Sequence, residues 1–354
     1  MTPIPGLDLD AVARFLDPAV GGLSGTLQAE VIPGGRSNLT YRVTDGETTW
    51  ALRRPPLAHV LPTAHDMTRE ERILRALESS SIPVPRVVAS SADIEITGAP
   101  FYVMEWVDGN IIRNRLPLAY PRTPTTRQEL STALVDTLVS LHAIDPATVG
   151  LGDFGRPDGF LERQVRRWWQ QWEASKTREL PSIEELHRRL QSSIPEQSPH
   201  GIVHGDYRLD NIMFAPHDPS QVVAVLDWEM ATIGDPLCDL GLLLVYWSDS
   251  DDDPAAIAIE SNAITRDDGF FSRLTLIHEY SVASHRSLEN LDWYVVLGLY
   301  KLAIIAEGIT ARHKMGMTVG EGFEAMGEMV PELVEHALRR ADRSRVAGLA
   351  AGAR

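Results

Sequence analysis

The sequence has little cysteine and no excess of positive charge. Its one cysteine, Cys238, excludes an intrachain disulfide, as is usual for proteins of a reducing cytoplasm. The formal net charge of −16 argues against nonspecific binding to nucleic acid, whose phosphates attract basic proteins. Acidity of this size is common among soluble proteins, although an acidic surface would also tolerate a cationic substrate.

The sequence also lacks the features of a leader or a membrane span. The first residues, MTPIPGLDLDAVARFL, have no basic segment followed by an apolar run, so we expect no signal peptide. Apolar stretches such as LGLLLVYW at 240–247 are far shorter than the roughly 20 residues that a spanning helix needs. We therefore expect a cytoplasmic protein without a membrane partner, and 354 residues suit one large domain or two lobes.

The first third of the chain has the pattern of a small α+β lobe. Alternating apolar and polar residues predict strands at 27–32, 39–44 and 50–54, and the segments VPRVVASS and PFYVMEWV predict two more. Between them, DMTREERILRALESS at 66–80 has the spacing of a helix. We predict a small five-stranded antiparallel sheet with one helix, forming an N-terminal lobe over residues 1–106.

The remainder of the chain is predicted to be mostly helical. Leucines repeat along one face of 128–144, and Trp168 and Trp172 share a face of 161–175, where packing in a core or interface is favoured. Further helices are expected near 237–247, 270–284, 293–313 and 319–342. The tail, RSRVAGLAAGAR, lacks an apolar face and is expected to fray. These patterns predict a larger, mainly helical C-terminal lobe over residues 107–354.

The most informative segments are VHGDYRLDNIMF at 203–214 and VLDWEMATIGDPLCDLG at 225–241. Asp206 and Asn211 are five residues apart, and Asp227 follows after a span that suits a short hairpin. Phosphoryl transfer needs a group to accept the proton of the nucleophile and oxygen ligands for Mg²⁺, and these side chains provide both. His204 is predicted to hold the loop through its ring. The alternative for any one of these residues is an ordinary Asx turn.

These segments resemble the aminoglycoside phosphotransferase and choline kinase family, over roughly residues 25–340. HGDYRLDN matches the catalytic loop of that family, Asp227 its metal-binding aspartate, and GDPLCD with LGLLL the helix that follows. The resemblance implies a protein-kinase-like fold, with Asp206 as catalytic base and Asn211 and Asp227 as Mg²⁺ ligands. It also implies that Asp239 is buried and accepts backbone N–H bonds of the catalytic loop. The segments YRV, LRRPP, REERILRAL and YVMEWVDG look most like the branch associated with acyl-CoA dehydrogenases.

The same resemblance allows the nucleotide side of the N-terminal lobe to be read. PGGRSN at 33–38 takes the place of the glycine-rich loop, and Ser37 is expected to contact phosphate oxygens of ATP. Arg53 stands where protein kinases have their phosphate-binding lysine and keeps its positive charge. Glu70 is expected to orient Arg53, with Glu71 as the alternative.

MEWVDG at 104–109 resembles the linker between the two lobes of a kinase. There the backbone of Glu105 and Val107 would bind the adenine edge of ATP. Glu229 replaces the glycine of the kinase D-F-G motif, and it is expected to contact a second metal or the substrate, or to be structural.

Three functions are compatible with this sequence. The favoured one is an ATP- and Mg²⁺-dependent kinase for a hydroxyl group of a small molecule. The others are a catalytically inactive nucleotide-binding scaffold and a protein kinase. Asp227 and Asp239 are only twelve residues apart, which leaves no room for the activation segment of a protein kinase.

The phosphate acceptor stays open between a hydroxyacyl compound and an aminoglycoside-like cation. By family architecture, its site would lie near Trp168, residues 249–253 and residues 278–285. The acidic run SDSDDDP at 248–254 either supplies an acidic pocket for a cation or forms a solvated loop that ends a helix.

Overall fold

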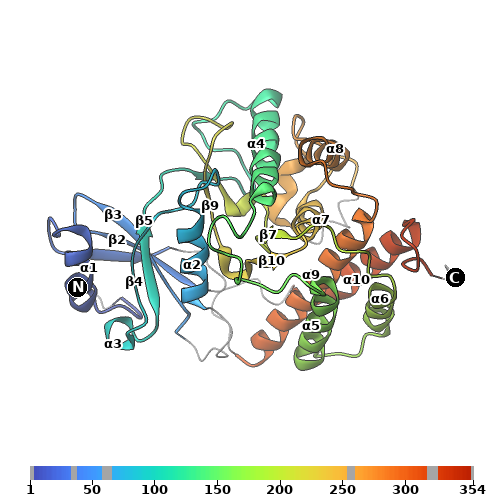
Figure 1. Cartoon of the computed structure of the whole chain (residues 1–354), viewed down its shortest axis with the longest axis horizontal. Coiled ribbons are helices and arrows are strands. Elements are labelled where there is room, and N and C mark those ends of the chain that lie inside the picture. Colours follow the sequence, from blue (N-terminus) through green and yellow to red (C-terminus); the bar gives the residue numbers. More distant parts are fainter. Residues whose placement is uncertain (1–3, 33–37, 58–65, 253–259, 317–325, 352–354) are drawn as a thin grey trace. The chain divides into compact units, whose positions relative to one another are not determined.

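The computed structural model describes residues 4–32, 38–57, 66–252, 260–316 and 326–351 (Figure 1). The chain divides into two compact units. The first contains residues 1–109 and 223–231, and the second contains residues 110–222 and 232–354. The segment 223–231, which carries Asp227, lies in the sequence range that was assigned above to the C-terminal lobe. The functional division at residue 106 stays a prediction.

The first unit is built on the predicted five-stranded sheet. Its strands are β1 (Gln28–Val31), β2 (Leu39–Thr44), β3 (Thr49–Arg54), β4 (Val87–Ser91) and β5 (Phe101–Glu105). Their order across the sheet is β1-β2-β3-β5-β4, and every neighbouring pair is antiparallel. The predicted α+β class and the five antiparallel strands are therefore confirmed.

The described part of the first unit contains more helix than the single helix predicted. Besides α2 (Met67–Leu77), it has α1 (Leu9–Val20), the one-turn α3 (Ile94–Thr97) and a 3-10 turn, η2 (Trp228–Met230). The Asp8 carboxylate begins α1 by accepting N–H bonds of the first turn, and Val12 and Leu16, four residues apart, pack into the core. This capping signal before an amphipathic segment was overlooked in the sequence.

The two larger helices cover opposite faces of the sheet, as Figure 1 shows within the first unit. On the side of α1 lies an apolar cluster that includes Leu52. Side chains alternate along β3, so Arg54 shares that side, donating to the carbonyls of Gly6 and Thr97. Arg53 points to the opposite side, where it reaches Glu70 of α2.

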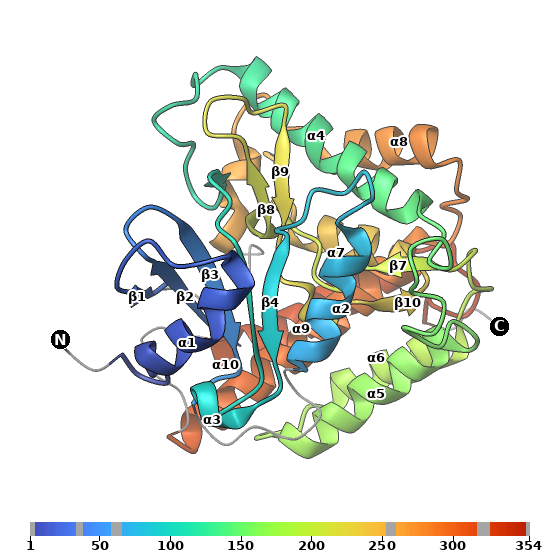
Figure 2. The ribbon, with the colours of Figure 1, turned by 60° about the vertical axis from the view of Figure 1, so that its left-hand side comes forward.

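The second unit is mainly helical, as predicted. Its helices are α4 (Pro124–Ala143), α5 (Phe160–Ser175), α6 (Pro181–Ser192), α7 (Leu237–Tyr246), α8 (Arg273–Ser284), α9 (Leu291–Lys314), α10 (Met326–Arg343) and the 3-10 helix η4 (Glu260–Arg266). α4 packs against α8, and α5 and α6 form a neighbouring pair (Figure 2). Trp168 and Trp172 are both buried, as expected for core residues.

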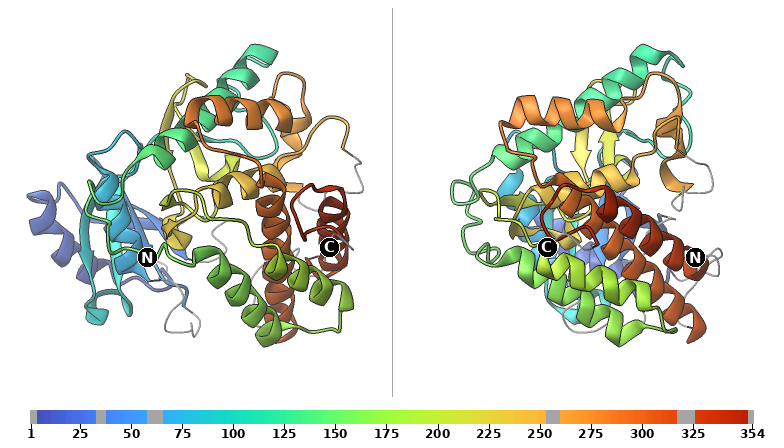
Figure 3. Two further views of the ribbon diagram at one scale, coloured as in Figure 1. Left: turned by 45° about the vertical axis from the view of Figure 1, so that its right-hand side comes forward. Right: turned by 90° about the vertical axis from the view of Figure 1, so that its right-hand side faces the viewer.

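Helix α9 is the centre of the second unit, and it contacts α10, α7, α5 and α6 (Figure 3). By length and composition it could cross a membrane, yet 83% of its most apolar window is buried in the protein. Gly241 lets α7 approach α9 closely, because a Cβ at that position would lie 2.7 Å from the backbone of Tyr294.

Short strands position the loop that carries Asp206. β7 (Gly201–Val203) pairs antiparallel with β10 (Thr232–Gly234), and β6 (Asn110–Ile111) pairs with β8 (Ile212–Phe214). The loop leaves β7, passes through the 3-10 helix η1 (Leu209–Asn211) and enters β8; β9 (Val222–Val225) begins at the boundary between the units. The expected fraying of the tail is wrong up to residue 351, since Val346 and Leu349 are buried.

Candidate active site

The predicted catalytic residues Asp206 and Asn211 contact each other within the second unit. The Nδ2 of Asn211 donates to the Asp206 carbonyl at 2.8 Å and to the Asp206 Oδ2 at 3.0 Å. These two bonds orient the amide, and its Oδ1 makes no hydrogen bond with the part of the chain that the structure describes. A neutral oxygen held beside a carboxylate suits Mg²⁺, which prefers hard oxygen ligands.

Asp239, at the start of α7, holds the catalytic loop by its backbone. Its side chain is fully buried; Oδ2 accepts the His204 N–H and Oδ1 the Gly205 N–H, each at 2.7 Å. The Nε2 of His142 lies 3.3 Å from Oδ2. A carboxylate that accepts two backbone N–H groups fixes both peptides, because moving either one would leave a buried charge with an unpaired lone pair.

The protonation states of this buried group follow from its surroundings. Burial acts to raise the pKa of Asp239, but the hydrogen bonds that it accepts from the His142 ring and the His204 backbone act against burial, and the pKa lies below its ordinary value. Burial lowers the pKa of His142, whose Nδ1 lies 2.8 Å from the Tyr280 hydroxyl. Asp239 is therefore an anion and His142 a neutral ring that donates to it.

His204 holds the loop through its ring. Its Nδ1 accepts the N–H of Asp206 at 3.2 Å, and its ring packs edge-on against Tyr207. A ring nitrogen that accepts a backbone N–H two residues along the chain closes a tight local turn. This turn fixes the orientation of the Gly205–Asp206 peptide, from which the Asp206 side chain extends.

Arg208 is a further charged residue of the loop, which the sequence analysis did not single out. Its Nε lies 3.3 Å from the Asp206 Oδ2 and its Nη2 lies 3.0 Å from the Asp210 Oδ2. Its guanidinium also lies over the ring of Tyr246, 4.7 Å from the centroid. The available signal was its position two residues after Asp206, on the same short loop.

The first unit contains a separate cluster of charges around Arg53. The Arg53 Nε lies 2.9 Å from the Glu70 Oε1, so Glu70 and not Glu71 is its partner. The Arg53 Nη2 lies 2.5 Å from the Asp227 Oδ1 and 3.9 Å from the Glu229 Oε2. Burial raises the pKa of the Glu70 carboxyl, and the positive charge of Arg53 acts against that rise. One guanidinium thus compensates three carboxylates.

Asp227 has an unusual backbone conformation at the start of η2. Its φ of 66° lies in the left-handed region, which costs energy for a residue with a Cβ. Its side chain is about one-third exposed, at 32%. Glu229, two residues on, accepts a hydrogen bond from the Nδ2 of Asn38 at 3.1 Å. The direct contact between Arg53 and Asp227 was not foreseen, because 174 residues separate them in sequence.

Asp227 suits the role of a metal ligand, because its carboxylate is partly exposed and its Oδ1 lies against Arg53, which leaves Oδ2 for a metal ion. Asn211 and Asp227 belong to different units, so their pairing on one metal ion stays a prediction of the sequence. Among the described residues, no three side chains of His, Cys, Asp and Glu gather as in an all-protein metal site. Mg²⁺ is commonly bound through only one or two carboxylates together with substrate phosphates.

The residues predicted to bind the rest of the nucleotide stay predictions. The N–H of Glu105 donates to the carbonyl of Arg86 at 2.9 Å, and its carboxylate accepts a bond from the Arg86 Nε at 2.8 Å. Any contact of adenine with the backbone of Glu105 would therefore use its carbonyl. Val107 follows the end of β5, and Ser37 lies outside the described residues.

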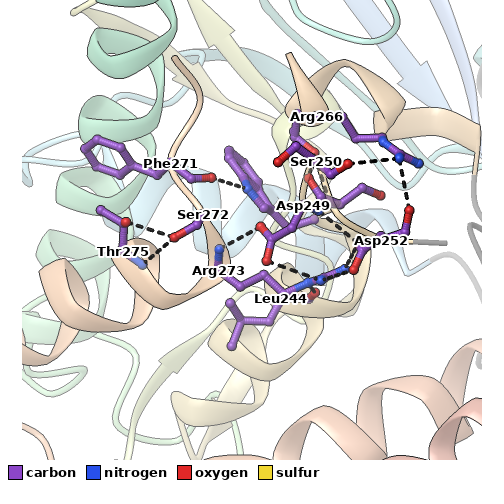
Figure 4. Close-up of polar contacts among 12 residues, drawn as sticks. Leu244, Asp249, Ser250, Asp252, Arg266, Phe271, Ser272, Arg273 and Thr275 are labelled. Atoms are coloured by element: carbon purple, nitrogen blue, oxygen red, sulfur yellow. Dashed lines mark hydrogen bonds and ion pairs between the residues drawn. The ribbon is translucent and has the colours of Figure 1, made fainter. Parts of the chain in front are cut away.

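In the described part of the acidic run, two carboxylates pair with an arginine (Figure 4). Arg273, the first residue of α8, points between Asp249 and Asp252. Its Nη1 and Nη2 lie 2.8 and 2.7 Å from the two carboxylate oxygens of Asp252, and its backbone N–H donates to Asp249 at 2.8 Å. Arg266 donates to the carbonyls of Ser250 and Asp252. Asp249 and Asp252 are therefore ion-paired within the protein.

Comparison with known proteins gives the family. The sequence model of the phosphotransferase enzyme family matches residues 28–269. The chain belongs to this family. It is also 31% identical over 344 residues to acyl-CoA dehydrogenase family member 11 of Gallus gallus, covering 95% of this chain and 44% of that protein. The chain thus spans less than half the length of the curated relatives it matches.

Solved structures of family members share the fold. A crystal structure of a Ralstonia eutropha protein, provisionally named an aminoglycoside phosphotransferase, has a TM-score of 0.80 and 28% identity, and covers 96% of this chain and 99% of that chain. An aminoglycoside phosphotransferase in ternary complex with AMP-PNP and hygromycin B has a TM-score of 0.60 and 14% identity, and covers 94% and 99% of the two chains. The predicted protein-kinase-like fold is therefore confirmed.

Proposed function

We propose that this phosphotransferase moves the γ-phosphoryl group of ATP to a hydroxyl group of a small molecule, with Mg²⁺ as cofactor. The observation that carries the proposal is the pairing of Asp206 with Asn211 on a loop whose backbone is held by the buried Asp239. Hydrogen bonds of this kind keep a carboxylate and an amide oxygen in fixed directions before any substrate arrives.

In the proposed reaction Asp206 accepts the proton of the acceptor hydroxyl. The hydroxyl oxygen forms a bond to the γ-phosphorus, the bond from that phosphorus to the β–γ bridging oxygen breaks, and ADP leaves with the electron pair. The Arg208 Nε lies 3.3 Å from the Asp206 Oδ2, so its positive charge stands beside the oxygen that would take the proton. Tight positioning accounts for much of the rate of such reactions, since the transition state needs little covalent help from the protein.

Arg53, Asn211 and Asp227 are assigned to the nucleotide and its metal. When bound, Mg²⁺ would neutralise charge on the phosphate oxygens as the γ-phosphoryl group is transferred. Arg53, oriented by Glu70, would bind phosphate oxygens with its planar fork. In the structure Arg53 is shared with Asp227, so the nucleotide would compete with Asp227 for one face of the guanidinium.

Of the two acceptor classes, a hydroxyacyl compound is favoured over a polycation. Asp249 and Asp252 already pair with Arg273, so these two carboxylates are less available to an aminoglycoside-like acceptor. The kinship with acyl-CoA dehydrogenase family member 11 also suits an acyl substrate. A protein kinase is disfavoured because η2 and β10 occupy the span from Asp227 to Asp239, where protein kinases have their activation segment.

The test is transfer of labelled phosphate from ATP with Mg²⁺ to a panel of hydroxyacyl-CoAs, free hydroxy acids and aminoglycosides. We expect transfer to one or more hydroxyacyl compounds and none to aminoglycosides. Asp206→Asn should reduce kcat by about 100-fold or more, because an amide has no basic oxygen to take the proton. Asp218→Asn, on the turn after β8, is the matched control and should retain full activity.

Three results would count against the proposal. Stabilisation by ATP and Mg²⁺ without transfer to any acceptor would support the inactive scaffold instead. Full activity of Asp206→Asn would exclude this residue as the base. Loss of folding in that variant, read by circular dichroism, would make Asp206 structural.

A further inference from the structure

Lys301 is a partly buried cation of the second unit that the proposed reaction does not use directly. Of the 33 lysine and arginine residues of the chain, only Lys176, Lys301 and Lys314 are lysines. Lys301 lies in the middle of α9, between the buried residues Tyr300 and Leu302. Its Nζ donates to the carbonyl of Gly205 at 2.5 Å and lies 5.5 Å from the ring centroid of Trp168.

The carbonyl that Lys301 contacts belongs to the peptide that links Gly205 to Asp206. The N–H of the same peptide donates to the ring of His204 at 3.2 Å. Lys301 and His204 therefore hold the two ends of one peptide plane, and that plane sets the direction in which the Asp206 side chain leaves the backbone. The N–H of Gly205 is held separately by Asp239 at 2.7 Å.

The fold explains why a lysine occupies this position. Gly241 allows α7 and α9 to cross closely, so a side chain of α9 reaches the loop that Asp239 of α7 also holds. The buried ring of Trp168 on α5 lies beside the same ammonium group. An ammonium group at the end of a flexible stem can donate to a single carbonyl in such a space, whereas the wider guanidinium needs room for a planar fork.

The charge of Lys301 is matched to this position. Burial lowers the pKa of Lys301, and the carboxylates of Asp206 and Asp239 act against this by favouring the protonated form. A protonated ammonium donates a stronger hydrogen bond to a carbonyl than a neutral amine does. Its π contact with Trp168 adds a further attraction for the cation.

We propose that Lys301 is a positioning residue for the catalytic base, because it fixes the Gly205–Asp206 peptide from α9 while Asp239 fixes the preceding peptides from α7. The inference rests on the proposed function in assigning the base role to Asp206. The physical claim, that Lys301 orders the loop at 204–211, is independent of any activity.

The test compares Lys301→Met, Lys301→Gln and Lys301→Arg with the wild type and with Lys314→Met. Lys314 lies on the same helix, and its Nζ donates to the Thr177 hydroxyl at 2.9 Å, so it serves as the matched control. The rate of amide hydrogen exchange in peptides spanning 203–211 measures how well the loop is ordered. Initial rates with an acceptor identified by the phosphate-transfer assay give kcat and the KM for ATP.

We expect faster exchange of the loop amides and a decrease in kcat of about 10-fold to 100-fold in Lys301→Met, since a shift of about 1 Å in a catalytic group can cost that much. The KM for ATP should change by less than about twofold, because Lys301 contacts the loop next to Asp206 and not the proposed phosphate-binding residue Arg53 or the proposed metal ligand Asp227. Lys301→Gln keeps a donor for the carbonyl and should recover part of both effects. Lys314→Met should match the wild type.

Several results would overturn the proposal. Unchanged exchange at 203–211 in Lys301→Met would show that this bond does not order the loop. An equal loss in Lys301→Gln and Lys301→Met, or a loss that falls on KM for ATP instead of kcat, would refute a positioning role. If Lys301→Met does not fold, the Gln and Arg variants decide the question. If the proposed function is wrong, neither the wild type nor any variant will transfer phosphate. Hydrogen exchange will still show whether Lys301 orders the loop.

Discussion

Replacing Arg53 by methionine tests the charge cluster of the first unit. The side chain of Arg53 is 14% exposed and that of Glu70 only 3%, so the pair is largely shielded from water. Removing one partner of a buried ion pair leaves the other uncompensated, which typically costs about 3–5 kcal/mol. Asp227 and Glu229 are more exposed, at 32% and 21%, and should contribute less to the loss.

The stability loss in Arg53→Met should depend on pH, and the pKa of Glu70 sets the direction of that dependence. Burial already raises the pKa of Glu70 above its ordinary 4.5, and losing Arg53 should raise it further. A carboxyl with a raised folded-state pKa binds more protons in the folded state, so the free energy of unfolding falls as the pH rises through that window. The deficit of Arg53→Met relative to the wild type should therefore be largest at neutral pH and should shrink as the pH falls toward 4.5.

Urea unfolding of the wild type, Arg53→Met and the double variant Arg53→Met/Glu70→Gln at several pH values measures these terms. The double variant removes both charges and should regain most of the stability lost by the single variant. A deficit below about 0.5 kcal/mol at neutral pH would show that the pair is not buried in solution. A large deficit that does not change with pH would place its cause outside Glu70.

Three further predictions concern the second unit. Arg273→Met should lower the free energy of unfolding by about 1–3 kcal/mol, since it leaves partly buried carboxylates such as Asp249 without their partner, and thermal unfolding should detect the loss. Stability should decrease as the pH falls below 6.5, because His142 takes up a proton when unfolded but is kept neutral by burial when folded; His142→Gln should flatten this slope in urea unfolding curves. Gly241→Ala should cost about 1–3 kcal/mol by forcing α7 from the Tyr294 backbone, whereas an unchanged melting temperature would contradict the close contact.

The spacing of apolar residues along the sequence predicted much of the fold. The alternation at 39–44 and the helical spacing at 66–80 correspond to β2 and α2. Each of these elements packs one face against a core, so its apolar residues recur with the period of a strand or a helix. α1 was missed although Asp8 caps it, because a capping signal is weak without knowledge of what its apolar face packs against. The tail was misjudged for the same reason, since two apolar residues suffice where a core is nearby.

The candidate site divides between what a short segment contains and what the core brings to it. Asp206 and Asn211 could be paired from their spacing alone, because five residues of loop keep both side chains within reach of each other. Lys301 could not be linked to this loop, because it lies 96 residues from Gly205 and its helix has no marked apolar face to give a direction. The pairing of Arg273 with Asp249 and Asp252 could not be foreseen either, because 24 and 21 positions of sequence separate them.

The sequence by itself determined the family, the residue types of the loop and the charge of the residue at position 53, since each depends on residue types at short or fixed spacings. Only the tertiary structure decided which cations meet which carboxylates: Arg53 with Glu70 and Asp227, Arg208 with Asp206, and Lys301 with the backbone of the loop. Ion pairs and buried donors depend on distances of a few ångströms, and packing of whole helices and strands sets those distances.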